Sequence, residues 1–436
     1  MRLLIIGAGP GGYETAVEAA RRGMEVTLIA GGPLGGTCLN EGCIPTKTFC
    51  HYAELIEQNR RVGLDARPAF ADVAARKNAV LDQLRGGIGT LLRGVNVVHG
   101  RASFQSAHTV IVDGQEYSAD KIIIATGSKS ALLPVPGAEM AMTSREILDM
   151  TEVPSSICVI GGGVIGLEFA SIFSSFGSQV TVLEYCKEIL PRFDIDLTKR
   201  LKQALGKRGI KIETQAQVTA INGGTVKYLK KDAECEVHAD RVLMAVGRIA
   251  NTDGLNLEAA GIERGRRGIT VDANFRTSVP DVYAVGDVTG GMMLAHVATY
   301  QGIRALNDIE GREDNIRFDL VPAAVFTMPE VATIGLTEEE CRERGIGIRC
   351  LKSFYRANGK AVSMDETDGY CKVIADAADG RILGCHILGV HSSDLIHEMA
   401  ALMNTGATIN DARDIIHAHP TLSEVLQAAV LSFPKL

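Results

Sequence analysis

The sequence contains no tryptophan, and aromatic residues make up only 5% of it. No apolar run reaches the roughly 18 residues that a membrane-spanning helix needs, so no membrane association is expected. The formal net charge is -7 and no stripe of Lys and Arg stands out, which argues against nucleic-acid binding. No cysteines or histidines have the spacing of a zinc site, so no metal is expected. A chain of 436 residues, 46% of them hydrophobic, is long enough for two to four domains.

The first residues already belong to a predicted domain. Met1 and Arg2 lead directly into LLIIGAGPGG, which predicts a buried strand that runs into a glycine turn. No signal-peptide or transit-peptide pattern precedes this strand. We therefore expect a cytoplasmic protein, or one trimmed to its mature form.

Two segments have the pattern of a dinucleotide-binding βαβ unit. The first has Gly7, Gly9 and Gly12 between a strand at 3–6 and a helix at about 13–22. In such a turn one glycine makes the turn, one lets the backbone approach a pyrophosphate, and one allows close helix packing. The pattern recurs in GGGVIG, as Gly161, Gly163 and Gly166. The sequence therefore predicts two dinucleotide sites in one chain.

The two units differ at the end of their second strand. An acidic residue there usually binds the adenosine ribose. Glu184 takes this place in the second unit, where its carboxylate would accept a 2′-hydroxyl and repel a 2′-phosphate. We expect the second site to prefer NAD over NADP. In the first unit the residue is Ala30, so this contact is missing.

Three apolar segments each end in a small-residue turn. Residues 122–127 (IIIATG) and 242–247 (VLMAVG) predict strands that return each unit to its own sheet. Residues 281–287 (DVYAVGD) predict a further strand that delivers Asp287 to a turn. A carboxylate at a strand end could bind a ribityl or ribose hydroxyl.

Cys38 and Cys43 lie close together in GGTCLNEGCIPTK. Two such thiols can form a structural disulfide, bind a metal or act as a redox pair. A disulfide needs Cα atoms within about 4.4 to 6.8 Å, and positions i and i+5 of a regular helix point about 140° apart. We therefore expect an interrupted helix, with flexibility at Gly42 and Pro45 at the first position of the next helix. Cys43 would then lie at a helix N-terminus, which stabilises a thiolate and favours redox chemistry.

From about residue 319 the pattern changes to mixed strands and helices without a phosphate-binding turn. Near the end lies HAHPTLSE, in which Glu424 follows His419 by five residues. A histidine whose ring is oriented by a carboxylate could act as a general acid or base. The sequence alone does not bring His419 to Cys38.

Taken in order, GAGPGG, GGTCLNEGCIPTK, GGGVIGLE, AVGR, VYAVGD and HAHPTLSE resemble the pyridine nucleotide-disulfide oxidoreductases over nearly the whole chain. Within that family the dithiol and histidine motifs are most similar to those of the dihydrolipoamide dehydrogenases. The resemblance implies an α/β fold with two Rossmann-like domains, arranged as in glutathione reductase, and a C-terminal α+β dimerisation domain. The implied division is FAD domain 1–145 and 250–319, NAD domain 146–249, and interface domain 320–436.

The resemblance also assigns roles to residues. Cys38 would exchange with substrate, Cys43 would face the flavin, and Lys47 and Glu168 would form an ion pair near it. His419 would be the base, oriented by Glu424, and it would act on the dithiol of the other subunit of a homodimer. The cofactors implied are FAD and NAD. FAD would be held by Gly7, Gly9, Gly12, Gly36, Thr37, Lys47, Thr126, Gly127, Gly286, Asp287 and Ala295, and NAD by Gly161, Gly163, Gly166, Glu184 and Gly247.

The implied activity is a dihydrolipoyl dehydrogenase, which oxidises dihydrolipoamide through the Cys38–Cys43 disulfide and FAD and reduces NAD⁺. Its dithiol could be free lipoamide or a lipoyl domain of a 2-oxo acid dehydrogenase or glycine cleavage complex. One alternative is another NAD(P)H-dependent disulfide reductase of the glutathione reductase type. The other is a non-catalytic flavin-binding subunit. The chain departs from the family at Ala30 and at Gln301, where acidic residues are usual.

Overall fold

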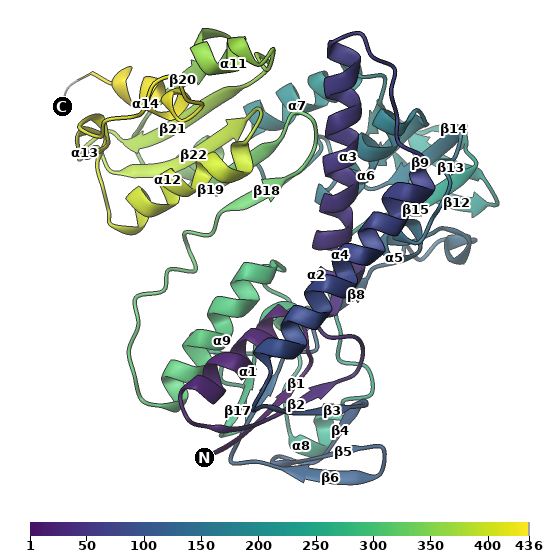
Figure 1. The fold of residues 1–436 in the computed structure, drawn as a ribbon, viewed down its shortest axis with the longest axis vertical. Coiled ribbons are helices and arrows are strands. Elements are labelled where there is room, and N and C mark those ends of the chain that lie inside the picture. The colour runs from purple at the N-terminus through teal and green to yellow at the C-terminus, as the bar shows by residue number, and fades with distance from the viewer. Residues whose placement is uncertain (435–436) are drawn as a thin grey trace.

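The computed structural model describes residues 1–434, which fold around three main sheets (Figure 1). The first is parallel, in the order β17-β7-β1-β2-β3, and fills the lower part of Figure 1. Its strands are β1 (Arg2–Ile6), β2 (Glu25–Ala30), β3 (Asn96–His99), β7 (Lys121–Ile124) and β17 (Val282–Ala284). The chain thus returns to this sheet after building a second one.

Alternating residues of the first sheet are buried on both faces, as a parallel sheet requires. One face packs against the helices α1 (Pro10–Arg21), α4 (Phe70–Leu91) and α9 (Ala295–Ile309). The other face is covered by α8 (Leu257–Ala260) and by a small antiparallel sheet of β4 (Ala102–Ser106), β5 (Thr109–Val112) and β6 (Gln115–Ser118).

The second sheet has the same plan. It is parallel, in the order β11-β10-β9-β15, with β9 (Ser156–Ile160), β10 (Gln179–Glu184), β11 (Lys211–Thr214) and β15 (Arg241–Met244). One face packs against α6 (Val164–Phe176) and α7 (Ile195–Lys207). The other faces an antiparallel sheet of β12 (Gln217–Asn222), β13 (Thr225–Lys230) and β14 (Ala233–His238). A two-stranded sheet, β8 (Ser128–Ser130) with β16 (Arg248–Ala250), joins the two units.

The internal repeat predicted from the sequence is confirmed in hydrogen-bond detail. Gly7 N donates to Ile29 O and Gly161 N donates to Leu183 O, both at 2.8 Å. Both glycines have a left-handed backbone, with φ of 114° and 111°. The predicted return strands also pair as expected, because β7 lies beside β1 and β15 beside β9.

The third sheet is antiparallel, in the order β18-β19-β22-β21-β20. Its strands are β18 (Ala323–Val325), β19 (Val331–Gly335), β20 (Ile348–Phe354), β21 (Tyr370–Asp376) and β22 (Ile382–Leu388). Helices α12 (Ser392–Asn404), α13 (Ile409–Arg413) and α14 (Glu424–Leu431) pack on one face, and the short helices α10 (Glu338–Glu343) and α11 (Gly359–Ser363) lie in the connections. An extended segment after α9 links this mixed domain to the rest of the chain (Figure 1).

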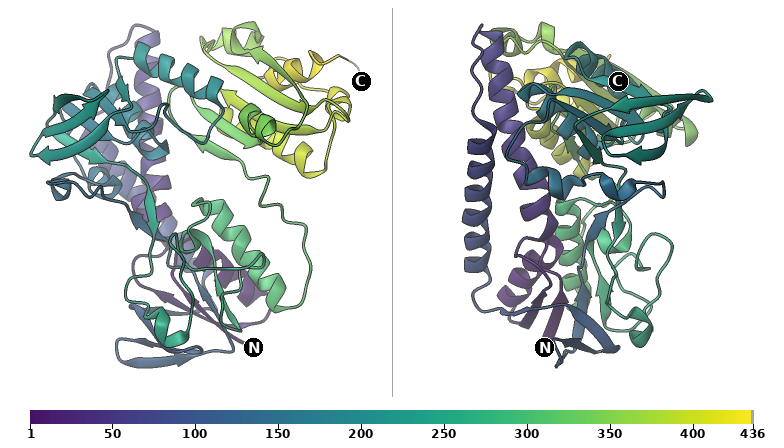
Figure 2. Two further views of the ribbon diagram at one scale, coloured as in Figure 1. Left: turned by 180° about the vertical axis from the view of Figure 1, so that it is seen from behind. Right: turned by 90° about the vertical axis from the view of Figure 1, so that its right-hand side faces the viewer.

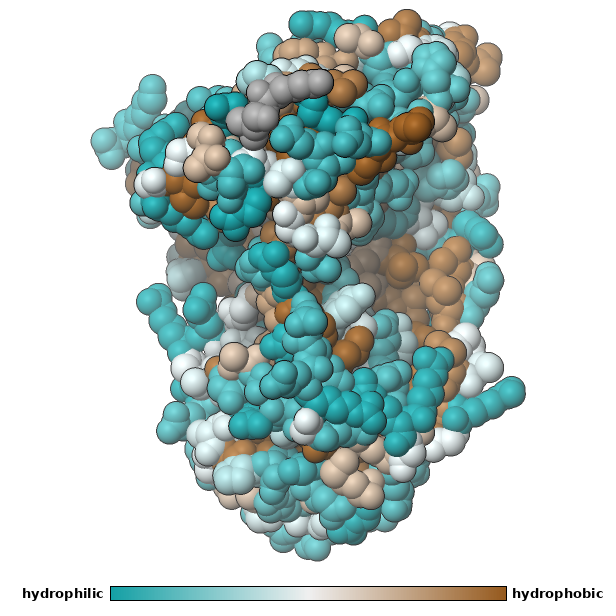
Figure 3. Space-filling model, turned by 90° about the vertical axis from the view of Figure 1, so that its left-hand side faces the viewer, coloured by the Kyte–Doolittle hydropathy of each residue, from teal (hydrophilic) through white to brown (hydrophobic). Residues whose placement is uncertain are grey.

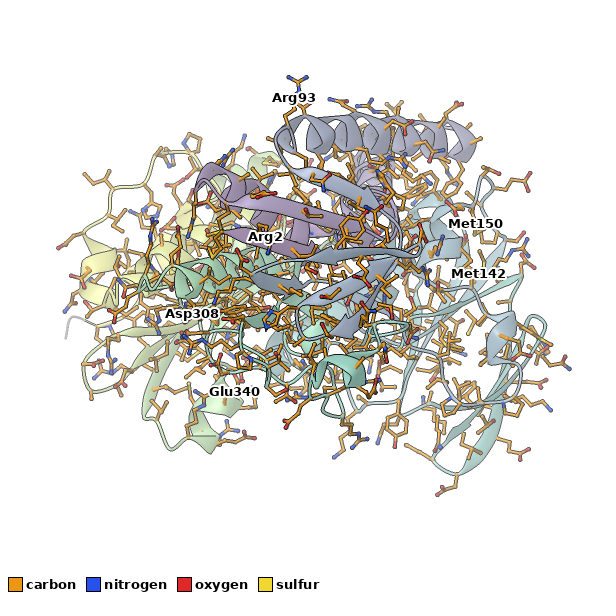
Figure 4. The ribbon with its side chains drawn as sticks, turned by 90° about the horizontal axis from the view of Figure 1, so that it is seen from below. Arg2, Arg93, Met142, Met150, Asp308 and Glu340 are labelled. Carbon is orange, nitrogen blue, oxygen red and sulfur yellow. The ribbon has the colours of Figure 1, made fainter. Side chains whose placement is uncertain are left out.

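A pair of long helices holds the parts together. Helix α3 (Cys43–Arg61) runs beside α4 along the length of the molecule (Figure 2). Seen from below, Met142 and Met150 beside the second sheet lie to the right of both Arg2 and Glu340 of the third sheet's domain (Figure 4). Among residues 1–434, no helix is both long and apolar enough to cross a membrane.

Helices α1 and α9 approach so closely that only glycine fits at their crossing. A Cβ added to Gly302 would lie 1.8 Å from the buried Oγ1 of Thr15. We predict that Gly302→Ala destabilises the protein by about 1–3 kcal/mol, because the extra methyl group overpacks this contact. Gly206→Ala, on the exposed side of α7 where a Cβ meets open space, is the matched control and should stabilise by up to about 1 kcal/mol. Equal urea-unfolding midpoints for the two variants would contradict this account of the crossing.

Candidate active site

A single cleft of about 2900 Å³ runs between the two parallel sheets and on toward the third. Figure 3 shows the hollow across the middle of one face of the molecule, with hydrophobic side chains exposed in it. The cleft brings together most of the residues predicted from the sequence, namely Gly7, Gly9, Gly36, Thr37, Cys38, Cys43, Lys47, Thr126, Gly127, Gly161, Gly163, Glu168, Glu184, Gly247, Gly286, Asp287 and Ala295.

The glycine turns lie at the carboxyl ends of β1 and β9, directly before α1 and α6. Gly9 and Gly163 are the N-caps of these helices and neither has a side chain that would cover the free backbone N–H groups. Gly12 and Gly166 instead face their own turns, where a Cβ would lie 1.8 Å from Gly7 O and 2.0 Å from Gly161 O. These positions leave two helix N-termini open to phosphate, as pyrophosphate binding requires.

The two thiols lie on either side of a break between helices. Cys38 is in α2 (Gly36–Glu41) and Cys43 is the first residue of α3, with Gly42 between them at φ -149° and ψ -111°. The expected interruption is therefore present. The expected place of Pro45 at the first helical position is wrong, because the helix already begins at Cys43 and Pro45 lies two residues inside its first turn. Proline is tolerated there because the first-turn N–H groups have no partner within the helix.

The Cys38 and Cys43 thiols have different pKa values because their surroundings differ. The hydrogen bond from Cys38 to Cys43 raises the pKa of the Cys38 thiol and lowers the pKa of Cys43 to about 7. Cys43 is solvent-exposed as a residue, so only partial desolvation in the cleft opposes its thiolate, while the Lys47 ammonium favours it. Cys43 is thus the thiol that ionises first, in agreement with its place at the N-terminus of α3.

Lys47 and Glu168 form a bidentate ion pair in the cleft. Lys47 Nζ lies 2.9 and 2.8 Å from the two carboxylate oxygens of Glu168, and 4.5 Å from the centre of the Phe326 ring. Burial alone would lower the pKa of Lys47, but the charge of Glu168 raises it above its usual value. The backbone N–H of Phe326 donates to Glu168 Oε1 at 3.0 Å. Sequence reasoning missed Phe326, because a backbone amide has no sequence signal.

Asp287 is held by groups that the sequence did not single out. Ser128 Oγ donates to Asp287 Oδ2 at 2.5 Å, and Arg248 donates to Ser128 Oγ at 2.7 Å and to Ser128 O at 2.8 Å. Gln301 accepts a hydrogen bond from Gly286 N at 2.7 Å. Arg248 ends the AVGR motif, which was the available signal for it.

His419 and Glu424 are not brought to the dithiol within this chain. His419 Nδ1 lies 2.9 Å from Glu424 Oε1, as predicted for a base and the carboxylate that orients it. Glu424 Oε2 also accepts a hydrogen bond from Thr421 N at 2.8 Å. However, the His419 side chain is 76% exposed, and neither residue lines the cleft. Any role of this pair at a dithiol requires a second copy of the chain.

The two βαβ units differ at the end of their second strand, as predicted from the sequence. Glu184 is buried and accepts hydrogen bonds from Gly162 N and Cys186 N, each at 2.6 Å. Its carboxylate thus closes the turn at the mouth of the second site and still has lone pairs for a ribose hydroxyl. Ala30 is equally buried at the matching position but offers no acceptor.

The residues present fit two dinucleotides. One polar atom supports this directly, because Asn40 Oδ1 is buried without a hydrogen-bond partner beside the first turn. The amide of Asn40 is fixed by its Nδ2, which donates to Leu34 O and Gly36 O at 3.0 and 2.9 Å. A hydroxyl-bearing cofactor would satisfy the orphaned oxygen. Among residues 1–434, no three His, Cys, Asp or Glu side chains are grouped as metal ligands.

We predict that Ala30→Glu slows the loss of FAD about tenfold, because a carboxylate there would accept backbone and ribose hydrogen bonds as Glu184 does. Ala30→Gln is the matched control, since it adds the same length without the charge and should slow FAD loss less. The rate is measured by the rise of flavin fluorescence on dilution. Faster FAD loss in the glutamate variant would contradict this explanation.

Comparison with known proteins agrees with this geometry. The family model of pyridine nucleotide-disulphide oxidoreductases matches residues 1–302, and the model of their dimerisation domain matches residues 321–430. Dihydrolipoyl dehydrogenase of Geobacillus stearothermophilus is 39% identical over 98% of this chain and 94% of the relative. A dihydrolipoyl dehydrogenase of Bacillus subtilis is 40% identical over 98% and 95%.

Solved structures are also similar over the whole chain. The HOCl-induced flavoprotein disulfide reductase RclA from Escherichia coli has a TM-score of 0.91 at 32% identity and covers 100% of both chains. LpdA from Mycobacterium tuberculosis has a TM-score of 0.91 at 28% identity and covers 99% of both chains. The chain therefore belongs to the pyridine nucleotide-disulphide oxidoreductase family, whose members are FAD-dependent disulfide oxidoreductases that use a pyridine nucleotide.

Proposed function

We propose that this protein oxidises dihydrolipoamide, free or on a lipoyl domain, and reduces NAD⁺ through Cys38, Cys43 and FAD. The observation that carries the proposal is the dithiol beside the Lys47–Glu168 ion pair, in one cleft with both glycine turns. The full-length relatives named dihydrolipoyl dehydrogenase support this choice of substrate.

The dithiol chemistry follows from the unequal sulfurs. In the oxidised protein Cys38 and Cys43 share a disulfide, and a substrate thiolate attacks Cys38 Sγ. The S–S bond breaks and Cys43 leaves as the thiolate, the form that its lowered pKa of about 7 favours. The second substrate thiolate then displaces Cys38, so the substrate leaves as a cyclic disulfide and both cysteines are reduced.

Within the ion pair, the Lys47 ammonium supplies positive charge near Cys43. Lys47 follows Cys43 by one helical turn, so its ammonium lies on the same face of α3 and stabilises the Cys43 thiolate. FAD, when bound, supplies two-electron transfer between this thiolate and the nicotinamide of NAD⁺. Asp287, with Ser128 and Arg248 behind it, would hold the ribityl chain, and Glu184 the adenosine ribose of NAD⁺.

A homodimer would supply the proton acceptor. The matched dimerisation domain contains His419 and Glu424, and in one chain the His419 side chain is 76% exposed while that of Glu424 is largely covered. Ile416, three residues before His419, is 95% exposed, as expected of an apolar side chain that meets a partner. We infer that His419 of one subunit takes protons from the dithiol bound at Cys38 of the other, with Glu424 fixing its ring.

Two rival functions remain distinguishable. A reductase of the glutathione type would be expected to use NADPH, but Glu184 lies where a 2′-phosphate would be repelled. A non-catalytic flavin-binding subunit would have no use for the His419–Glu424 hydrogen bond or for a Cys43 thiol of lowered pKa.

We predict that the purified FAD-loaded protein reduces NAD⁺ with dihydrolipoamide and reduces NADP⁺ poorly, because Glu184 disfavours the 2′-phosphate. The panel also contains a lipoylated domain and, in the reverse direction, glutathione disulfide with NADH or NADPH. Cys43→Ser, which should keep FAD but lose turnover, controls for flavin chemistry that bypasses the dithiol. Absence of activity with both lipoamide and the lipoylated domain would overturn the assignment.

A further inference from the structure

Lys372 is a fully buried lysine outside the site, and it has no part in the chemistry described so far. Lys372 is in the middle of β21 and is 0% exposed. Its Nζ lies 2.7 Å from Asp194 Oδ2 and 3.1 Å from Asp196 Oδ2, and it also contacts Glu338. Asp194 is also 0% exposed. Because burying charge is costly, such a pair in the contact between two domains calls for an explanation.

On the NAD side of this contact, Asp194 caps the helix α7. It is the N-cap of α7, where its Oδ1 accepts hydrogen bonds from Asp196 N at 3.1 Å and Leu197 N at 3.3 Å. Its other oxygen is the one that binds Lys372. Helix α7 lies between the third sheet and the second (Figure 1). Lys372 of the C-terminal domain therefore fixes the N-cap residue of a helix in the other domain.

The loop that ends at Asp194 forms a wall of the NAD part of the cleft. It comprises residues 185–193, and Leu190 to Phe193 line the cleft. Leu190 N donates to Gly162 O at 3.0 Å, and Phe193 N donates to Leu190 O at 2.9 Å. Leu190 is 1% exposed and has φ of 46°, a conformation that a leucine keeps only when its surroundings impose it.

The end of β10 and the 185–193 loop together hold the second glycine turn from both sides. Glu184 Oε2 accepts from Gly162 N, while Gly162 O accepts from Leu190 N. In the first unit the matching carbonyl, Ala8 O, accepts from Gly35 N at 2.9 Å, directly before the dithiol helix α2. In both units, the segment whose backbone N–H donates to a carbonyl of the glycine turn thus continues into a helix. Only in the second unit is that helix anchored by a buried ion pair to the C-terminal domain, as far as residues 1–434 are concerned.

We propose that Lys372 is a positioning residue for NAD. From the C-terminal domain it holds Asp194, which fixes the end of the 185–193 loop, and that loop holds the Gly162 peptide in the turn that receives the NAD pyrophosphate. The inference rests on the NAD site of the proposed function and is independent of which dithiol is oxidised. Lys372 touches neither substrate nor cofactor, so its effect should appear in NAD affinity and not in the dithiol reaction.

The test compares three FAD-loaded variants. Lys372→Met removes the cation, and Asp194→Asn keeps an oxygen that can cap α7 but removes the Lys372–Asp194 ion pair, while the contacts of Lys372 with Asp196 and Glu338 remain. Lys352→Met is the matched control, because Lys352 Nζ binds the outer carboxylate Asp196 at 2.7 Å and is partly exposed. Calorimetry measures the Kd of NAD⁺ and of ADP-ribose. We expect Kd to rise about tenfold in the first two variants and to change by less than about twofold in the control.

A structural role alone would give a different pattern. The proposal expects KM for NAD⁺ to rise while KM for the dithiol, the rate of disulfide reduction by dithiol and the FAD content stay unchanged. If Lys372→Met does not fold, the double variant Lys372→Met/Asp194→Asn removes both charges and carries the same expectation. The proposal would be overturned if the Kd of NAD⁺ and ADP-ribose stayed unchanged in any folded variant that lacks the ion pair. It would also be overturned if the kinetic parameters for the dithiol and for NAD⁺ worsened in parallel. ADP-ribose binding needs no dithiol, so an inactive protein with intact ADP-ribose binding would count against the proposed substrate alone.

Discussion

The Lys47–Glu168 ion pair is the contact on which the site depends, because three parts of the chain meet in it. Lys47 comes from α3, which begins at the dithiol, and Glu168 comes from α6, which begins at the second glycine turn. The backbone N–H of Phe326, just after β18, binds the same carboxylate. One buried carboxylate therefore sets the distance between thiol, nucleotide turn and C-terminal domain. Removing either charge would leave the other uncompensated in a largely buried place.

The same ion pair explains how one short segment can supply two sulfurs with separate tasks. Cys43 lies one helical turn before Lys47 and at the N-terminus of α3, so both the local charge and the helix dipole favour its thiolate. Cys38 lies beyond the break at Gly42 and keeps its proton, because its pKa is raised by its hydrogen bond to Cys43. The break in the helix thus brings the sulfurs together and also makes them chemically unequal.

Much of the fold and of the site could be predicted from the sequence, since these parts depend on local residue patterns. The glycine turns, the return strands after Ile122 and Val242 and the helix N-terminus at Cys43 follow from residue spacing. Contacts between distant segments could not be predicted in this way. The Phe326 amide and the Lys372–Asp194 pair join residues more than 150 positions apart and have no local pattern. The place of Pro45 was wrong because proline is allowed throughout the first turn, so it marks a helix start only approximately.

The most direct test of the account is the visible spectrum of the FAD-loaded protein after anaerobic reduction by two electrons, recorded between about pH 5 and 9. The account predicts a long-wavelength charge-transfer band from the Cys43 thiolate that is present at high pH. Because the pKa of Cys43 is lowered to about 7, the band should fade as the pH falls through that value. It should be absent in Cys43→Ser, and in Lys47→Met its midpoint should move to higher pH. Bleaching of the flavin with no such band at any pH would contradict the account.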